Sequence, residues 1–313
     1  METRHAGGRG RLVAGLGALA LISAACADDE AVGGRRGAPV VVATMSIWAD
    51  VVANVACDGS AEVESLIPAG GDPHEFEPSL ADRARLESAA LIVANGLSLE
   101  EGLEDTLVSV EAAGTPVIRL TDHVDIIASS SSGPDPHIWF DPTRISDALP
   151  VLAEHLVEDA GLEKQTVDDC MVAYREELDR VDAMIAEMVA TVPADRRELV
   201  TNHDSLGYFA DRYGLEILGT VIPSSSTLAE TNPAALEQLA ELMEDNAVRT
   251  IFSDARQSPD DAQALANRVG VAEVVSLLTG GLGDAESGSG TYVDFLLTNA
   301  RLIVAGLLPS EDR

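Results

Sequence analysis

The chain has 313 residues, of which 46% are hydrophobic but only 4% aromatic, so its core must be built mainly from aliphatic side chains. Its formal net charge is −33 at pH 7, and Lys164 is the only lysine. Such an acidic surface repels nucleic acid and anionic lipid head groups, which excludes nucleic-acid binding. The charge alone does not indicate cation binding, because Asp and Glu are common on solvated surfaces.

The first residues predict an export signal. Arginines precede an apolar stretch from Leu12 to Ala25 that is too short to span a membrane. The sequence from Leu21 to Cys26 resembles a bacterial lipoprotein cleavage site, so we expect residues 1–25 to be a signal peptide and Cys26 to be the lipidated first residue. Cleavage without lipidation, giving a soluble periplasmic protein, is the alternative. Both interpretations predict an exported protein.

From Pro39 onward, short β-branched runs alternate with helical patterns. The runs that predict strands in the first half are residues 40–44, 62–67, 91–94 and 116–120. Between them, residues 47–56 and 80–88 have the periodicity of helices, and Ser79 is placed to cap the second helix. This alternation is typical of a mostly parallel sheet with helical crossovers.

The second half repeats this pattern. Its predicted strands are residues 198–201, 216–221, 250–253 and 273–277. The helical patterns that separate these strands are residues 205–213, 233–246 and 259–269. We therefore expect an α/β protein of two similar lobes, each with a roughly four-stranded, mostly parallel sheet flanked by helices.

A long helix is predicted between the two halves. Apolar residues recur every three or four positions from Val167 to Val192, which traces one face of a helix of about seven turns. The expected organisation is a flexible tether at 26–38, an N-terminal lobe at 39–160, a linking helix at 161–192 and a C-terminal lobe at 193–313. A single rigid connection predicts small lobe movements when a ligand binds.

If Cys26 is lipidated, two other cysteines remain, Cys57 and Cys170. In an exported protein a disulfide between them can persist, but two buried free thiols are equally consistent with the sequence. Their separation along the chain does not decide, since pairing depends on distance in the folded protein.

Three of the six histidines stand in loops or at loop edges: His74, His137 and His203. His74 and His203 follow predicted strands, where open α/β sheets place their ligands. Three imidazoles with one further donor make a tetrahedral metal site, with nitrogens about 2.0–2.1 Å from the ion. The alternative for each histidine is a hydrogen-bonding loop residue. The carboxylates expected to hold the second ring nitrogens are Asp72, Glu75, Asp135, Asp141 and Asp204.

Four motifs resemble those of the zinc/manganese ABC-transporter substrate-binding proteins. They are Gly71 to Ser79, Asp135 to Pro142, Asn202 to Phe209 and Thr291 to Asp294. The resemblance covers roughly residues 40–308 with the motifs in the family's order. It implies a metal bound between the lobes by His74 and His137 from the first lobe and His203 from the second.

The resemblance also bears on which metal is bound. The position of His203 is similar to a histidine in zinc-preferring members and to a glutamate in manganese-preferring ones, which favours Zn²⁺ over Mn²⁺. The chemistry agrees, because imidazole suits Zn²⁺ while Mn²⁺ prefers oxygen donors. The family's usual fourth ligand is an aspartate, and Gly280 occupies that position here. Asp284 is our first candidate for the fourth ligand, with water or Asp254 as alternatives.

The other histidines are not expected to bind the metal. The segment 122–135, where many zinc-specific members carry a His-rich loop, holds only His123. His155 lies on a helical stretch and His5 in the export signal. We therefore expect all three to have no role in metal binding.

The resemblance implies a receptor that captures Zn²⁺ and delivers it to the permease of an ABC-type importer, at the outer face of the cell membrane. We expect a monomer whose lipid anchor is its only membrane contact, and the participation of a metallochaperone stays open. The alternatives are a manganese receptor and a metal-dependent surface adhesion protein. A zinc hydrolase is disfavoured because the chain has no HExxH motif, so no enzymatic activity is expected.

Overall fold

The computed structural model describes residues 37–57, 59–129, 133–270, 273–284 and 287–308. From Gly37 onward they form one compact unit. The predicted signal peptide, the lipidated Cys26, His5 and most of the tether lie outside the described residues. No helix among the residues that the structure describes has the length and apolarity needed to cross a membrane.

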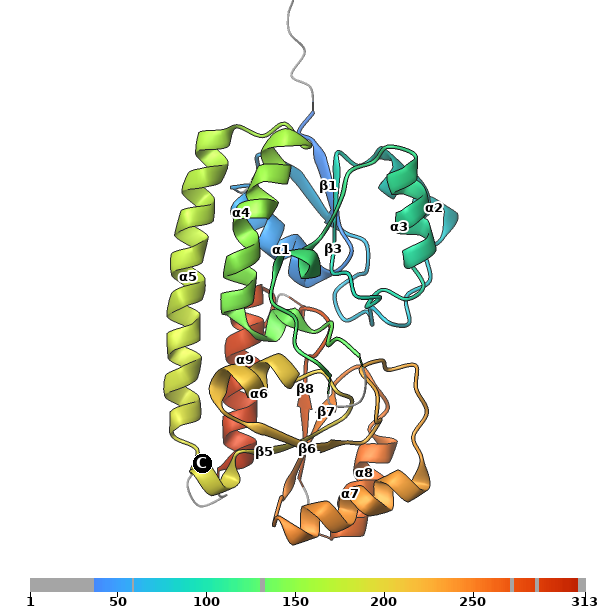
Figure 1. Cartoon of the computed structure of the whole chain (residues 1–313), viewed down its shortest axis with the longest axis vertical. Coiled ribbons are helices and arrows are strands. Elements are labelled where there is room, and N and C mark those ends of the chain that lie inside the picture. Colours follow the sequence, from blue (N-terminus) through green and yellow to red (C-terminus); the bar gives the residue numbers. More distant parts are fainter. Residues whose placement is uncertain (1–36, 58, 130–132, 271–272, 285–286, 309–313) are drawn as a thin grey trace, which may run out of the picture. The chain divides into compact units, whose positions relative to one another are not determined.

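The first lobe contains a four-stranded parallel sheet in the order β2-β1-β3-β4. The strands are β1 (Val40–Ala43), β2 (Glu62–Ser65), β3 (Leu91–Ala94) and β4 (Val117–Arg119). Alternate residues of the strands face opposite sides of the sheet, and each side is covered by helices. On one side lie α2 (Leu80–Ser88) and α3 (Glu104–Ala112), and on the other α1 (Ser46–Val55) and α4 (Pro142–Glu158) (Figure 1).

The second lobe repeats this arrangement, with the strand order β6-β5-β7-β8 and every pairing parallel. Its strands are β5 (Glu198–Thr201), β6 (Glu216–Thr220), β7 (Thr250–Asp254) and β8 (Glu273–Leu277). Its helices are α6 (Gly207–Tyr213), α7 (Pro233–Asp245), α8 (Asp260–Val269) and α9 (Tyr292–Leu307). The predicted fold of two similar four-stranded α/β lobes is confirmed, with strand ends that differ by two residues at most from those expected.

The long helix between the lobes is α5 (Lys164–Ala190), which has 27 residues. The Glu163 side chain caps it by accepting hydrogen bonds from the backbone N–H groups of Gln165 and Thr166. One apolar face of α5 is buried along its whole length, as the sequence periodicity predicts. The helix runs beside both lobes (Figure 1).

The lobes are joined by more than this one helix. Helix α9 of the second lobe packs against α5 and α1. One hydrophobic cluster therefore continues through both lobes, and it contains Trp48, Trp139, Tyr292 and Phe295. Two hydrogen bonds fix its centre: Trp139 Nε1 donates to the Thr279 carbonyl oxygen at 2.8 Å, and the Tyr292 hydroxyl donates to the Trp139 carbonyl oxygen at 2.6 Å.

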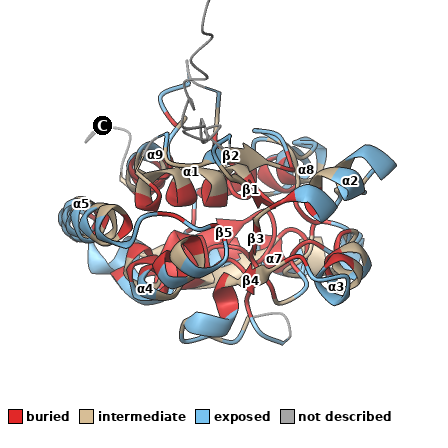
Figure 2. Cartoon of the chain, turned by 90° about the horizontal axis from the view of Figure 1, so that it is seen from above, coloured by how far each residue is buried: buried red, intermediate tan, exposed pale blue. Residues whose placement is uncertain are grey.

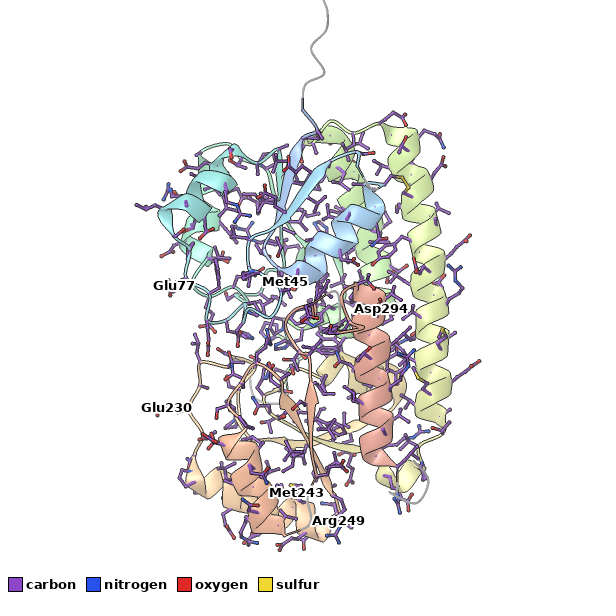
Figure 3. The ribbon with its side chains drawn as sticks, turned by 180° about the vertical axis from the view of Figure 1, so that it is seen from behind. Met45, Glu77, Glu230, Met243, Arg249 and Asp294 are labelled. Atoms are coloured by element: carbon purple, nitrogen blue, oxygen red, sulfur yellow. A yellow bond between two sulfur atoms is a disulfide. The ribbon has the colours of Figure 1, made fainter. Side chains whose placement is uncertain are left out.

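Burial follows this division of the core. Buried residues lie in the strands and on the inward sides of the helices, while the outer sides of α2, α3 and α5 are exposed (Figure 2). Two smaller clusters fill the space between each sheet and its outer pair of helices. Met45, which follows β1, lies near the junction of the lobes, whereas Glu77 and Glu230 lie on the side away from α5 (Figure 3).

Cys57 and Cys170 form a disulfide, with their Cα atoms 5.7 Å apart. The bridge joins the chain just after α1 to the second turn of α5. Of the two states that the sequence allowed, the structure contains the bridge and not two free thiols.

Candidate metal centre

His74 lies in the loop that follows β2, in an Asp-Pro-His turn. The Asp72 carboxylate closes the turn, because its Oδ1 accepts a hydrogen bond from the His74 backbone N–H at 2.9 Å. The imidazole is 5% exposed, and neither ring nitrogen makes a hydrogen bond among the described residues. Oε1 of Glu101 lies 3.7 Å from its Nδ1.

A second Asp-Pro-His turn places His137 directly before the 3₁₀ turn Ile138–Phe140. Here Asp135 Oδ1 accepts from the His137 backbone N–H at 2.9 Å and also contacts the ring Nδ1 at 2.8 Å. A carboxylate can only accept, so Nδ1 carries the proton and Nε2 keeps its lone pair. Nε2 is buried and makes no hydrogen bond among the described residues. The tautomer is therefore fixed with Nε2 as the nitrogen that could bind a metal ion.

His203 comes from the second lobe, two residues after the end of β5. Its backbone is held by two hydrogen bonds to its carbonyl oxygen, from the Thr201 hydroxyl at 2.8 Å and from the Ser205 N–H at 2.9 Å. The side chain is 2% exposed, and its Nδ1 has no hydrogen-bond partner among the described residues.

The three imidazoles meet between the lobes. One ring nitrogen from each lies within 4.8 Å of the other two, and the ring centroids are 5.3–6.0 Å apart. Among the residues that the structure describes, no other group of three or more His, Cys, Asp or Glu side chains converges in this way. Buried nitrogens without hydrogen bonds are costly, and a metal ion would satisfy them.

Burial also sets the protonation state of this group. It lowers the pKa of His74 and of His203 to about 3, and the neighbouring His137 lowers both further. Both rings are therefore neutral at pH 7. A neutral imidazole offers a lone pair to a metal ion without first releasing a proton.

The structure does not bring Asp284 into this group. The residue is exposed in the loop before α9, and its carbonyl oxygen accepts a hydrogen bond from the Ser287 N–H at 3.1 Å. The structure thus brings together the three histidines expected from the sequence, while the first candidate for a fourth donor lies outside the cluster.

Asp254, at the end of β7, is buried close to the imidazoles, but its carboxylate is already bonded. Oδ1 accepts from Arg256 Nε at 3.0 Å, Oδ2 accepts from Arg256 Nη2 at 2.6 Å, and the Thr279 hydroxyl also donates to Oδ2. Burial acts to raise the pKa of Asp254, but the Arg256 guanidinium holds it below its ordinary value. Sequence reasoning missed Arg256, although an Asp-Ala-Arg directly after a predicted strand is a visible signal.

The five carboxylates expected beside the histidines differ in role, and Asp135 bonds a ring nitrogen, that of His137. Asp72 bonds to backbone, as described. Asp141 caps α4 by accepting from the Thr143 N–H, Asp204 accepts from the Ser129 hydroxyl, and Glu75 is exposed. The expectation is wrong for Asp72 and Asp141. Asp72 accepts from the backbone N–H of His74 and from side chains of the second lobe, and Asp141 accepts from the backbone N–H of Thr143.

Of the histidines excluded from the site, His123 is exposed. His155 Nδ1 lies 2.6 Å from Asp159 Oδ2 on the surface of α4. Neither belongs to the converging group.

Hydrogen bonds between the lobes lie beside the centre. Asp72 Oδ2 accepts from the Thr227 hydroxyl and from Gln257 Nε2, both at 2.9 Å. The Ser226 hydroxyl donates to Glu101 Oε1 at 2.6 Å. The loop that carries His74 is thereby tied to two loops of the second lobe.

Residues 41–306 match the model of the ZnuA family, described as zinc-uptake complex component A, periplasmic. The chain belongs to the ZnuA family. A similar curated relative is the zinc-binding protein TroA of Treponema pallidum, 29% identical over 279 residues, which cover 87% of this chain and 89% of that protein. Another is the manganese-binding lipoprotein MntA of Halalkalibacterium halodurans, 26% identical over 92% of this chain and 95% of that protein.

Solved structures of similar proteins agree with the fold. The periplasmic zinc-binding protein TroA of Treponema pallidum superposes with a TM-score of 0.81 at 29% identity, covering 87% of this chain and all of that one. An S38A mutant of a Mn-bound periplasmic metal-binding protein from Candidatus Liberibacter asiaticus gives 0.78 at 26% identity, covering 86% of this chain and 100% of that one. This ZnuA-family chain is accordingly an extracytoplasmic, metal-binding substrate-binding protein of an ABC importer.

Proposed function

We propose that the protein captures Zn²⁺ between its lobes with His74, His137 and His203 and delivers the ion to the permease of an ABC importer. The observation that carries this proposal is the convergence of three buried imidazole nitrogens within 4.8 Å of one another. Zn²⁺ favours nitrogen donors in a tetrahedral arrangement, whereas Mn²⁺ favours oxygen donors. The activity is binding and delivery, with no reaction on a substrate.

The three imidazoles leave one position of a tetrahedral site, which we assign to water. Asp284 is exposed and lies outside the group, and Asp254 is bonded to Arg256. Water completes zinc sites of three protein ligands in other proteins.

We also propose that the protein works at the outer face of the cell membrane as a monomer. Removal of residues 1–25 would leave Cys26 to carry the lipid and residues 26–38 as the tether. Two relatives are named as lipoproteins, which supports the anchored form over the soluble one. Replacing Cys26 with Ala is expected to move the protein from the membrane fraction to the soluble fraction; retention in the membrane would contradict the anchor.

Competition titration against a chromophoric chelator tests the zinc proposal. Each of His74→Ala, His137→Ala and His203→Ala should weaken zinc binding by more than about tenfold, since each removes one of three protein donors. His155→Ala is the matched control and should bind zinc as the wild type does. Zinc at 100 times its dissociation constant should stabilise the wild type by about 2.7 kcal/mol and the triple variant not at all.

The second candidate cargo is Mn²⁺, because relatives of similar identity are named as manganese-binding proteins. The same titration separates the two ions. If the wild type held Mn²⁺ more tightly than Zn²⁺, the zinc assignment would be wrong, while the site and the transport role would remain.

A further inference from the structure

Beside the three imidazoles lies a buried ion pair between Asp254 and Arg256. The side chain of Asp254 is fully buried and that of Arg256 is 9% exposed. Arg256 Nη1 also donates to the Gly71 carbonyl oxygen at 2.7 Å, so the guanidinium reaches across to the loop that carries His74. The charges of both partners act on His203. The pair is therefore part of the surroundings of the metal centre, although neither residue contributes an atom to the converging group.

Both oxygens of the Asp254 carboxylate are already hydrogen-bonded. Oδ1 accepts from the backbone N–H of Arg256 at 2.9 Å and from its Nε at 3.0 Å. Oδ2 accepts from Nη2 at 2.6 Å and from the Thr279 hydroxyl. A bond from either oxygen to a metal ion would have to replace part of a bidentate, charge-assisted contact. In a buried site the guanidinium would then be left with a weakened partner, which is costly.

Gly280 provides the room for this arrangement. A Cβ atom at residue 280 would lie 2.8 Å from both Nη1 and Nη2 of Arg256 and 2.9 Å from Pro73 Cδ. Any side chain at residue 280 therefore conflicts with the guanidinium where it stands. The chain thus combines a residue without a side chain at 280 with a carboxylate at 254 that is held away from the metal.

We infer that Arg256 is a specificity-determining residue, which withholds the Asp254 carboxylate from the ion and so keeps the protein donors of the centre to imidazole nitrogen. This inference rests on the proposed function, since it concerns the selectivity of the same centre. The loss of a carboxylate oxygen from the donor set lowers the affinity for Mn²⁺ more than the affinity for Zn²⁺. Arg256 therefore raises the preference for Zn²⁺ over Mn²⁺ without touching the ion.

The test is the ratio of the Mn²⁺ and Zn²⁺ dissociation constants, measured by competition titration. Arg256→Met removes the guanidinium and frees the Asp254 carboxylate, so the ratio should shift toward Mn²⁺ by about tenfold or more. Arg256→Met combined with Asp254→Asn removes the freed carboxylate and should return the ratio to that of the wild type. Arg268→Met is the matched control, because Arg268 pairs with Glu237 and Glu244 on the exposed surface, and its ratio should not move.

The outcomes separate the inference from the proposed function. If folded Arg256→Met binds zinc with an unchanged ratio, Arg256 does not set selectivity, while the zinc receptor stands. If the wild type shows no zinc binding that depends on the histidines, the proposed function itself fails. The double variant with Arg256→Met and Asp254→Asn tests the inference even if Arg256→Met alone does not fold. If the double variant lost as much zinc affinity as the histidine variants and changed the Co²⁺ absorption spectrum, Asp254 would be a ligand and the inference would be overturned.

Discussion

The two Asp-Pro-His turns differ in one contact that matters for the metal. Asp72 bonds only the backbone of its histidine, whereas Asp135 also bonds the imidazole Nδ1 of His137. The sequence shows the same three residues in both places. Which atom each carboxylate reaches depends on the rotamer of the imidazole, and packing sets that rotamer. The His137 ring, for example, packs against Trp139, with the ring centroids 5.2 Å apart. The convergence of the three histidines could thus be expected from the motifs, but the contacts around them could not.

Asp135→Ala should lower zinc affinity by about 10–100-fold, because the His137 ring loses the partner that fixes its tautomer and orientation. Competition titration measures the change. The control is Asp159→Ala, which removes a similar carboxylate–imidazole contact at His155, outside the site. Equal affinities for the Asp135→Ala protein and the wild type would show that the tautomer is fixed by other means.

The buried residues His74 and His203 predict a pH dependence of the metal-free protein. Their folded pKa of about 3 lies below the unfolded value of 6.5, so the unfolded state binds more protons between these values and stability falls as the pH drops below 6.5. Each ring should cost about 2 kcal/mol at pH 5 relative to pH 7. Urea unfolding of the metal-free protein from pH 5 to pH 7 measures this loss.

The control for the pH experiment is the variant His203→Gln, which removes one titrating ring. Its stability should fall less steeply with acid than that of the wild type. An identical slope for both proteins would mean that His203 is not held neutral by the fold.

At the scale of the elements, hydrophobic periodicity predicted the strands and the linking helix well, because each is buried on a regular face. Strands β3, β5 and β8 begin and end at the expected residues. Periodicity did not reveal that α9 packs across the lobe boundary, since the contact between α9 and α1 joins opposite ends of the chain. The position of Arg256 was hidden for the same reason, because its contact with Gly71 lies across both lobes.

Helix α9 also holds the loop that carries Thr279 and Gly280. The buried Asn299 donates to the Leu278 carbonyl oxygen at 2.8 Å and accepts from the Leu278 N–H at 3.1 Å. Asn299→Leu should lower the free energy of unfolding by about 2–4 kcal/mol, because two partly buried backbone groups of Leu278 lose their partner. Chemical denaturation measures the change.

The matched control for that substitution is Asn267→Leu on the exposed surface of α8, which should change stability by less than about 0.5 kcal/mol. Similar effects of the two substitutions would show that the contact with Leu278 contributes little to stability.

At the scale of the whole molecule, the disulfide closes a loop across a sequence separation of 113 residues. A bridge over a loop of this size restricts the unfolded chain, and its removal should lower stability by about 2–5 kcal/mol. The variant with both Cys57→Ser and Cys170→Ser should therefore unfold at lower denaturant concentration. It should still bind one zinc ion, because all three imidazoles remain. Binding of less than one zinc ion per chain would mean that the disulfide also positions the residues of the metal centre.

The core shared by the two lobes limits how a captured ion can leave. Swinging one lobe wide open would bring Trp139, Tyr292 and Phe295 into contact with water, at about 1.5–3 kcal/mol for each large apolar side chain. Parting the loops opposite α5 instead breaks individual hydrogen bonds between the lobes, such as those from Thr227 and Gln257 to Asp72 and from Arg256 to Gly71. The ion should therefore leave between the loops opposite α5. A permease would need to contact only those loops to release it.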